Sequence, residues 1–309
     1  MQMNNYVLTL DVGGTEIKSA AVRTDSIIIE ETISIYESKS SSSKEIILDN
    51  FGQIINNTIA KFDQNAKCLG LCLAFPGPFD YENGICYIKG IGKYDSLYNV
   101  NMKAELRKII LSKCRNHLVD EFRIYFENDA RLFALGEYIS KHSGKYNRVV
   151  FITLGTGVGS AFIENGEILR DDKRIPPGGY IYNVKHGERT IEDKFSARGI
   201  LRLAQEIGLT DFESVKDLAQ AARMGDLRAS QLFSKYGELL GLALKPFLER
   251  FKADALVIGG QISKSSDLFL DKLKLSLENL PVNVMVTNES YIATFLGAYT
   301  YFMKKKGLI

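Results

Sequence analysis

A glycine turn near the start of the chain combines residue types that bind phosphate. The stretch Tyr6–Val22 reads YVLTLDVGGTEIKSAAV, which predicts an apolar strand, a tight turn and a second strand that returns along the first. Glycines permit turn conformations and let an anion approach main-chain N–H groups closely. A carboxylate beside such a turn suits the Mg²⁺ that accompanies a nucleotide, since this ion is usually held through water and one or two acids. The candidate residues are Asp11, Gly13, Gly14, Thr15 and Lys18, with Asp11 as the magnesium residue.

The element directly after the glycines distinguishes this turn from two better-known phosphate loops. A dinucleotide fingerprint or a Walker A loop requires a helix at that place. Here the strand-like run IKSAAV stands there, so phosphate would be bound by turn amides and not by a helix dipole. An ordinary β-hairpin with a glycine turn is the simpler alternative.

An adjacent amide and carboxylate form a second candidate site. The run RIYFEN predicts a strand, and Asn128 and Asp129 stand at its carboxyl end, directly before the helical pattern ARLFALGEYI. Such a pair can hold two neighbouring hydroxyls of a polyol while the carboxylate accepts a proton from one of them. Capping the following helix is the alternative role of Asp129, and the local residues leave both roles open.

The glycine turn then recurs. RVVFITLGTGVGSAFIENGEIL again predicts strand, turn and strand, with Thr156 and Gly157 in the turn. A further apolar strand ends in Gly259 and Gly260, where the flat face of a base could lie close to the backbone. The repetition indicates two related lobes that grip a nucleotide.

Other elements would position these residues. A capping box of Ser42 and Glu45 predicts the start of a core helix. The strand KCLGLCLAF leads into Pro76-Gly77-Pro78, so Gly77 is either a wall of the substrate pocket or part of a plain turn. The loop at 80–100 is long enough to be functional. We expect the boundary between the lobes in the polar stretch 115–121.

Composition excludes several classes of function. The 309 residues are 45% hydrophobic and 25% charged with a net charge of +2, as in a two-domain globular protein without a strongly charged partner. We therefore expect no nucleic-acid partner. The sequence has no run of 18 apolar residues and no signal-like start, so we expect a cytoplasmic protein without membrane contact. The four cysteines show no metal-binding spacing and are expected to be reduced and buried.

Six motifs in order resemble the ROK family of sugar kinases, within the actin-like ATPase superfamily. They are DVGGTEIK, PGPFDYENG, ENDARLFALGE, LGTGVGSAFIENG, VIGGQIS and FLGAY, and they span nearly the whole chain. The resemblance implies an α/β fold of two lobes, ribonuclease H-like, with a cleft between them. It also implies transfer of the γ-phosphoryl of Mg-ATP to a sugar hydroxyl, the one on C6 in glucokinases.

The resemblance assigns roles to the candidate residues. Asp129 would be the catalytic base, and Asn128 would contact the sugar. The two glycine turns would face the phosphates and the metal, and Gly259 with Gly260 would form the adenosine site. The expected lobes are 1–116 and 117–292, with a C-terminal helix at 293–309 that packs back on the first lobe.

The chain departs from the family in one segment. Typical members have a Glu-x-Gly-His segment that contacts the sugar near C1 and C2, and a cysteine-rich loop that binds a structural Zn²⁺ together with that His. Here Tyr180 stands in place of the Glu and Asn183 in place of the His, the loop has no cysteine, and Glu192 alone remains. Since a zinc site needs about four N or S ligands, we expect no structural zinc.

The same departure bears on specificity. A pocket that has lost polar partners for a sugar should discriminate poorly for it, so we expect glucose to be a poor substrate. A sugar modified or extended at C1 or C2 should be better, with Tyr94 and Tyr98 available to stack on it.

Two functions other than a sugar kinase are compatible with the resemblance. One is a ROK-type binding or regulatory protein without catalysis. The other is a ROK repressor with an N-terminal DNA-binding domain, which five residues before the first strand do not provide. For assembly, a homodimer is the default expectation.

Overall fold

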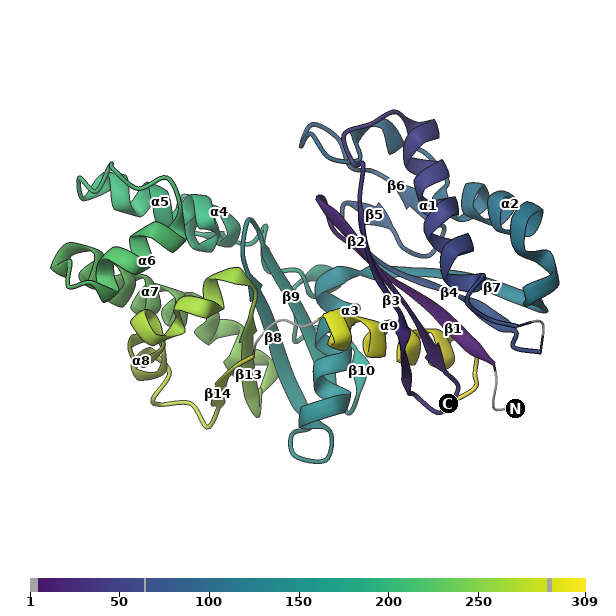
Figure 1. The fold of residues 1–309 in the computed structure, drawn as a ribbon. Helices are drawn as coiled ribbons and strands as arrows, with labels where there is room; N and C mark the ends of the chain where they lie inside the picture. Colours follow the sequence, from purple (N-terminus) through teal and green to yellow (C-terminus); the bar gives the residue numbers. More distant parts are fainter. Residues whose placement is uncertain (1–4, 64, 288–290) are drawn as a thin grey trace. The chain divides into compact units, whose positions relative to one another are not determined.

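The computed structural model describes residues 5–63, 65–287 and 291–309 and divides into two compact units. Unit 1 comprises Met1–Ser140 and Ser290–Ile309, and unit 2 comprises Lys141–Glu289. Each unit contains a five-stranded sheet with helices packed on it, which can be followed in Figure 1. The α/β fold expected from the sequence is confirmed.

The sheet of unit 1 has the strand order β3-β2-β1-β4-β7. Strand β2 runs antiparallel to both of its neighbours, β1 and β3, whereas β4 runs parallel to β1 and β7 runs parallel to β4. The bounds are β1 (Tyr6–Val12), β2 (Glu16–Arg23), β3 (Ile28–Glu37), β4 (Cys68–Phe75) and β7 (Leu118–Asn128). Helices α1 (Lys44–Ile59) and α2 (Met102–Cys114) cover one face, and α3 (Asp129–Glu137) and α9 (Tyr291–Lys305) cover the other (Figure 1).

The sheet of unit 2 repeats this pattern, with the order β10-β9-β8-β13-β14. Strand β8 pairs antiparallel with β9 and parallel with β13, as β1 does with β2 and β4. The bounds are β8 (Arg148–Leu154), β9 (Val158–Glu164), β10 (Glu167–Ile168), β13 (Ala255–Gly259) and β14 (Asn283–Val286). The two glycine turns, β1 to β2 and β8 to β9, therefore occupy equivalent places in two equivalent sheets.

Five helices form the rest of the core of unit 2. They are α4 (Ile191–Phe195), α5 (Ala197–Glu206), α6 (Val215–Arg223), α7 (Leu227–Phe251) and α8 (Ser266–Ser276), and they pack on one face of the sheet. Short two-stranded ribbons complete both units: β5 (Phe79–Asp80) with β6 (Ile85–Cys86) in unit 1, and β11 (Lys185–His186) with β12 (Arg189–Thr190) in unit 2.

Two details differ from the sequence predictions. The boundary lies at 140/141 and not at 116/117, because β7 pairs along β4 as far as Phe75 opposite Asn128 and so belongs to the first sheet together with α3. The cap of α1 is Ser43, whose hydroxyl accepts the Ile46 N–H, and not Ser42.

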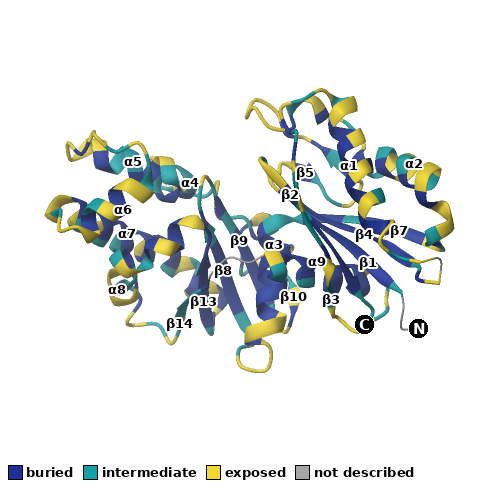
Figure 2. Cartoon of the chain, viewed as in Figure 1, coloured by how far each residue is buried: buried dark blue, intermediate teal, exposed yellow. Residues whose placement is uncertain are grey.

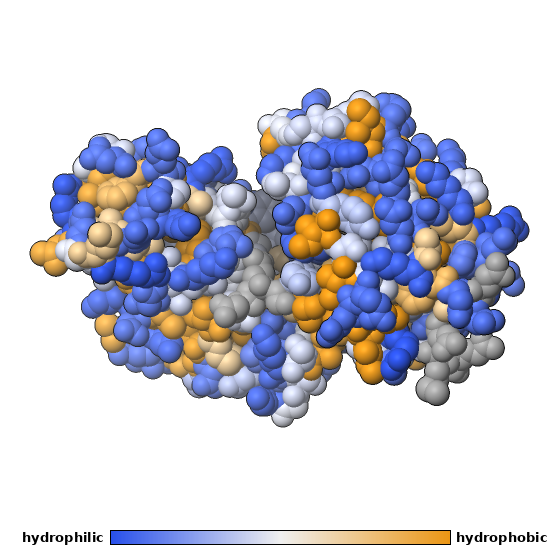
Figure 3. Space-filling model, in the orientation of Figure 1, coloured by the Kyte–Doolittle hydropathy of each residue, from blue (hydrophilic) through white to orange (hydrophobic). Residues whose placement is uncertain are grey.

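Burial follows the sheets, whose central strands are dark in Figure 2. All four cysteines are free and buried, as predicted. On the face that Figure 3 shows, hydrophobic residues form small separate groups among hydrophilic ones. In the part of the chain that the structure describes, the helices are all too short or too polar to span a membrane.

Candidate active site

The first glycine turn is held from behind by hydroxyl groups. Tyr94 donates a hydrogen bond to the Gly13 carbonyl over 2.8 Å, and Ser38 and Ser40 donate to the Gly14 carbonyl over 2.8 and 2.5 Å. Because the carbonyl oxygens are engaged on that side, the turn is fixed in one conformation. The Tyr94 side chain is buried, so the prediction that it can stack on a sugar is wrong. Tyr98 is 42% exposed, so its ring remains accessible.

The other side of the turn offers N–H groups. Those of Gly14 and Thr15 donate to no acceptor among the described residues. Asp11 and Lys18 face each other across β1 and β2 at the same end of the hairpin. Lys18 Nζ lies 3.7 Å from the Glu16 carboxylate. Two open N–H groups with a carboxylate and a cation beside them form a place that fits the phosphates of a nucleotide and a hydrated Mg²⁺.

A second lysine reaches this turn from the loop after β6. A methyl group added at Gly14 would lie 2.8 Å from Lys93 Nζ and would overlap the carbons of that side chain. Lys93 is exposed and has no ion-pair partner within the described ranges. The sequence analysis missed Lys93, because no pattern links a loop lysine to a turn so far back in the chain.

The catalytic candidate begins α3. The side chain of Asn128, not Asp129, caps this helix, since its Oδ1 accepts the Arg131 N–H over 3.3 Å. Asp129 is the first helical residue, and its carboxylate accepts the Ala130 N–H over 2.9 Å. Burial raises the pKa of the Asp129 carboxyl above its ordinary value, although these hydrogen bonds oppose the shift. With the cap supplied by Asn128, the carboxylate is a group whose desolvation suits a general base.

Asn128 is itself held by a tyrosine. Its amide nitrogen donates to the Tyr81 hydroxyl over 3.3 Å, and that hydroxyl donates to the Phe75 carbonyl over 3.1 Å. A methyl group at Gly77 would lie 3.2 Å from the same hydroxyl. The turn after β4 therefore lies next to Asn128. Tyr81 is a further residue of this site that the sequence analysis did not identify.

A buried ion pair supports the end of β7. Arg131 Nη1 lies 3.0 Å from Glu127 Oε1, which also accepts the Asn128 N–H over 2.8 Å. Both side chains are almost fully buried. Removing one member of such a pair leaves an uncompensated buried charge, so the pair fixes the junction that carries Asn128 and Asp129.

Strand register brings the candidates of unit 1 to one sheet edge. Asp11 pairs with Ala74 on β4, and Ala74 pairs with Glu127 on β7. Two strand spacings separate Asp11 from Glu127, which is roughly 10 Å. The phosphate turn and the Asn128–Asp129 junction thus lie at the carboxyl ends of parallel strands, within reach of the same small molecule.

The turn of unit 2 also has N–H groups without an acceptor. Gly155 N–H donates to the Gly157 carbonyl over 3.0 Å, and within the described ranges the N–H groups of Thr156 and Gly157 have no acceptor. A carboxylate lies against this turn. Glu192 Oε2 accepts the Val158 N–H over 3.1 Å, and a methyl group at Gly157 would lie 2.7 Å from it.

The segment that departs from the family pattern adjoins Glu192. The Tyr182 carbonyl accepts the Glu192 N–H over 3.0 Å, and the ring of Tyr180 packs edge-on against that of Tyr182. Asn183 is exposed and makes no side-chain hydrogen bond in the part of the chain that the structure describes. Tyr182 therefore contacts both Tyr180, through its ring, and Glu192, through its carbonyl, while Asn183 lies at the surface of unit 2.

The glycine pair after β13 has a packing role that the sequence did not reveal. Gly260 has a φ of +90°, and a methyl group there would overlap the Leu154 backbone at the end of β8. The glycine allows β8 and the turn after β13 to meet. Gly259 pairs with Thr153 as the last residue of β13. In the described ranges, groups of three or more His, Cys, Asp or Glu suited to a metal ion are absent.

Comparisons with known proteins identify a family, related sequences and a matching fold. A model described as "ROK family" matches residues 7–294. The chain is 26% identical over 302 residues to a glucokinase of Halalkalibacterium halodurans, covering 89% of this chain and 86% of the relative. It is 22% identical over 295 residues to a xylose repressor of Caldicellulosiruptor bescii, covering 87% of this chain and 66% of the repressor. The fold matches the crystal structure of a ROK hexokinase from Thermus thermophilus, with a TM-score of 0.76 at 17% identity, over 98% of this chain and 100% of that one.

Proposed function

Because the chain belongs to the ROK family, we propose that it is a sugar kinase that transfers the γ-phosphoryl group of Mg-ATP to a hydroxyl of a hexose or hexose derivative, the C6 hydroxyl in our proposal. One observation carries this proposal. The open N–H groups of the first turn follow β1 and the half-buried carboxylate of Asp129 follows β7, at one sheet edge where these two strands are two strand spacings apart.

The residues of unit 1 divide the chemistry between them. Asn128 and Asp129 orient the sugar hydroxyl, and Asp129 accepts its proton as the oxygen bonds to the γ-phosphorus. The bond from that phosphorus to the bridging oxygen breaks, and ADP leaves. The N–H groups of Gly14 and Thr15 and the ammonium of Lys93 stabilise charge on the equatorial oxygens, since such transfer has a loose, highly charged transition state. Asp11 would hold Mg²⁺ through water, and the metal would neutralise phosphate charge.

Residues of unit 2 complete the proposal. Thr156 and Gly157 would contribute N–H groups to the nucleotide phosphates, and Gly259 and Gly260 would line the adenosine site. The proposed sugar contacts near C1 and C2 are Tyr180, Asn183 and Glu192. Gly77 of unit 1 is a further proposed contact with the sugar. Since a phenol and an amide replace the family's carboxylate and imidazole there, we propose a sugar modified or extended at C1 or C2 as the preferred substrate.

The test is sugar-dependent release of ADP from Mg-ATP, measured over hexoses, amino sugars, N-acetylated sugars and disaccharides, with Asp129→Asn as the control. We expect turnover with a subset of the panel and loss of about 10²- to 10⁴-fold in kcat in the variant, the usual contribution of a general base. A variant with more than about a tenth of the wild-type kcat would remove Asp129 from this role. Glucose as the best substrate would contradict the specificity proposal alone.

A regulatory protein without catalysis is the second candidate, because the chain also resembles a xylose repressor. It would bind sugar or nucleotide without turnover. ATP binding in the absence of ADP release with every sugar of the panel would favour this candidate and exclude the kinase.

A further inference from the structure

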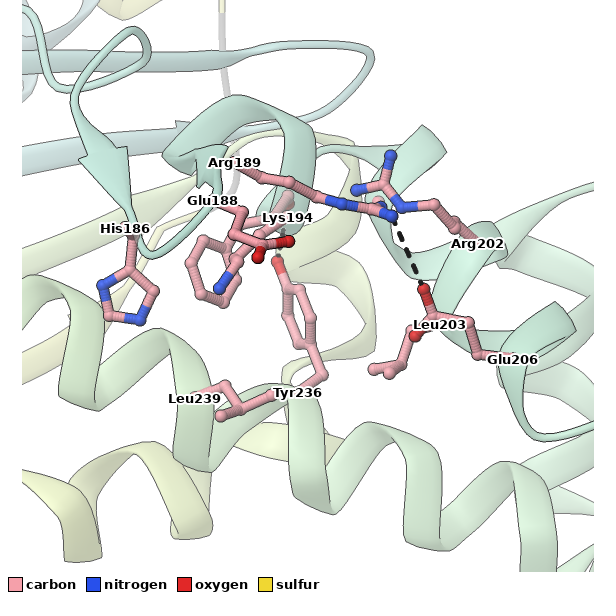
Figure 4. A pocket seen from close by; sticks show the side chains of 11 residues that line it. His186, Glu188, Arg189, Lys194, Arg202, Leu203, Glu206, Tyr236 and Leu239 are labelled. Carbon is pink, nitrogen blue, oxygen red and sulfur yellow. Dashed lines mark hydrogen bonds and ion pairs between the residues drawn. The ribbon is translucent and has the colours of Figure 1, made fainter.

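Unit 2 contains a cavity that none of the proposed roles uses. It has a volume of about 330 Å³, at the lower end of the range for small-molecule sites. Figure 4 shows that its lining comes from the β11–β12 ribbon, α4, α5 and α7.

The floor of the cavity is apolar. Phe195 and Tyr236 are only 2% and 1% exposed, and Leu203 and Leu239 lie beside them. The Tyr236 hydroxyl donates to the Phe195 carbonyl over 2.9 Å, so its polar end is satisfied within the fold. Since so little of either ring is exposed, a ligand on this floor would mainly meet the partly exposed side chains of Leu203 and Leu239.

The rim carries more cationic than anionic side chains. Arg189, Lys194, Arg202 and His186 stand there with two carboxylates, Glu188 and Glu206, and Arg189 lies 3.9 Å from Glu206 (Figure 4). Lys194 has no carboxylate within ion-pair distance among the described residues. Burial lowers the pKa of His186, and the nearby Lys194 charge adds to the shift. An unpaired ammonium in the lining of a cavity with an apolar floor matches a ligand with an anionic group and an apolar face.

We propose that this cavity binds a small organic anion with an apolar face, and that its occupancy alters the second phosphate turn through α4. The two sides of this short helix carry the connection. Glu192 and Lys194 are about 200° apart around the helix axis, so one side chain meets the turn while the other meets the cavity. Glu192 bonds the Val158 N–H, and the Ala197 N–H just beyond α4 donates to the Gly155 carbonyl.

Arg202 joins the cavity to α4 directly, since its guanidinium donates to the Asp193 carbonyl. A bound anion competes for this guanidinium. Releasing the Asp193 carbonyl loosens the middle of α4, and the position of the Glu192 carboxylate against the turn changes with it. A ligand that favours one position of α4 shifts the site only by its differential affinity for the two positions.

The experiment measures binding first and needs no kinase activity. Isothermal titration compares phenyl phosphate, inorganic phosphate and phenol as probes. We expect phenyl phosphate to bind at least about tenfold more tightly than inorganic phosphate or phenol. Inorganic phosphate can contact only the charged rim of the cavity, and phenol only its apolar floor. Inorganic phosphate binding as tightly as phenyl phosphate would overturn the proposed ligand class.

Variants assign the binding to this cavity. Lys194→Met should weaken the binding of phenyl phosphate by about tenfold, which is the contribution of one charge-assisted hydrogen bond. Leu203→Trp should abolish binding, because the larger side chain fills the cavity. Lys235→Met, on the exposed side of α7 where the lysine pairs with Glu238, is the matched control and should bind normally. Unchanged binding in both Lys194→Met and Leu203→Trp would place the probe elsewhere.

The coupling rests on the proposed function and is measured separately. Phenyl phosphate should change the KM for ATP or sugar at least about twofold in the wild type, by shifting the position of α4, and leave it unchanged in Leu203→Trp. If saturating phenyl phosphate leaves the wild-type KM unchanged, the proposed coupling is wrong. The titration would still show whether the cavity binds phenyl phosphate. Absence of any kinase activity would contradict the proposed function and leave the binding result standing.

Discussion

The protonation state of Asp129 that stabilises the folded protein is not the one that its proposed role as a base requires. Burial raises the pKa of this carboxyl from its ordinary value of 3.8, so the ionised form that a base requires is disfavoured in the folded state. Its protonated form stabilises the fold below about pH 4, and this contribution is lost as the pH rises through the folded-state pKa.

We therefore predict that Asp129→Asn raises the melting temperature at about pH 7, where the wild-type side chain is charged and the amide is not. The amide oxygen can still accept the Ala130 N–H. The difference should shrink as the pH falls towards about 4, because the wild-type carboxyl then takes up its proton. Calorimetry from about pH 4 to about pH 8 measures this, and a variant that melts below the wild type at neutral pH would show that the charge stabilises the fold.

Lys93 gives a second prediction at the residue scale. Lys93→Met should raise the KM for ATP roughly tenfold or more, because the ammonium at Gly14 makes a charge-assisted contact with phosphate that the thioether cannot make. Lys89→Met is the control from the same loop, since Lys89 lies 4.9 Å from the centre of the Tyr98 ring. Equal KM values for both variants and the wild type would show that Lys93 does not serve the phosphate turn.

At the scale of elements, two helices of unit 1 meet at a pair of glycines. A methyl group at Gly136 on α3 would overlap the Ala293 carbonyl, and one at Gly297 on α9 would overlap the Leu132 carbonyl. The backbones of α3 and α9 are thus in direct contact. This contact holds α3, whose first residue is Asp129, against the sheet.

We predict that Gly297→Ala destabilises the protein by at least about 2 kcal/mol, as overpacking against backbone does when nothing flexible can yield. Gly52→Ala is the matched control, because a methyl group on that helical glycine would meet side-chain atoms and no backbone, Ile109 Cγ2 at 2.7 Å and Lys113 Nζ at 3.8 Å, and alanine favours the helix. Urea denaturation measures both. Equal midpoints for the two variants would mean that the helices can separate without loss.

The sequence predicted those parts of the candidate site that depend only on neighbouring residues. Each glycine turn lies between two apolar runs, and Asn128–Asp129 lies between a strand and a helix, so spacing alone located them. Lys93 and Tyr81 are different, because they act on residues far away in the sequence. The boundary after 116 was misplaced for a similar reason: a polar loop marks a turn, but only pairing with β4 shows that β7 belongs to the first sheet.

At the scale of the whole molecule, the two sheets share one topology but differ at their edges. The segment after β10 contains no cysteine, and there a capping box of Thr190 and Asp193 begins α4. The Ser160 hydroxyl on β9 donates to the Gly179 carbonyl and accepts the Ile181 N–H. Side-chain hydrogen bonds thus order this segment.

We predict that the purified protein contains less than about 0.1 zinc per chain by elemental analysis, since a structural site needs about four N or S ligands. EDTA should leave its melting temperature unchanged, apart from any effect of removing Mg²⁺, which excess Mg²⁺ would restore. Stoichiometric zinc, or a melting temperature that only zinc restores, would contradict this.

The contact between α3 and α9 also orders events during synthesis. Unit 2, Lys141–Glu289, lies between these helices in the sequence. At about 5–20 residues per second, a ribosome needs roughly 7–30 s to add it. Throughout that interval the newly made α3 has no α9 to cover its glycine face, whereas unit 2 can fold as it emerges. The aspartate proposed to activate the sugar is therefore translated well before the helix that secures it.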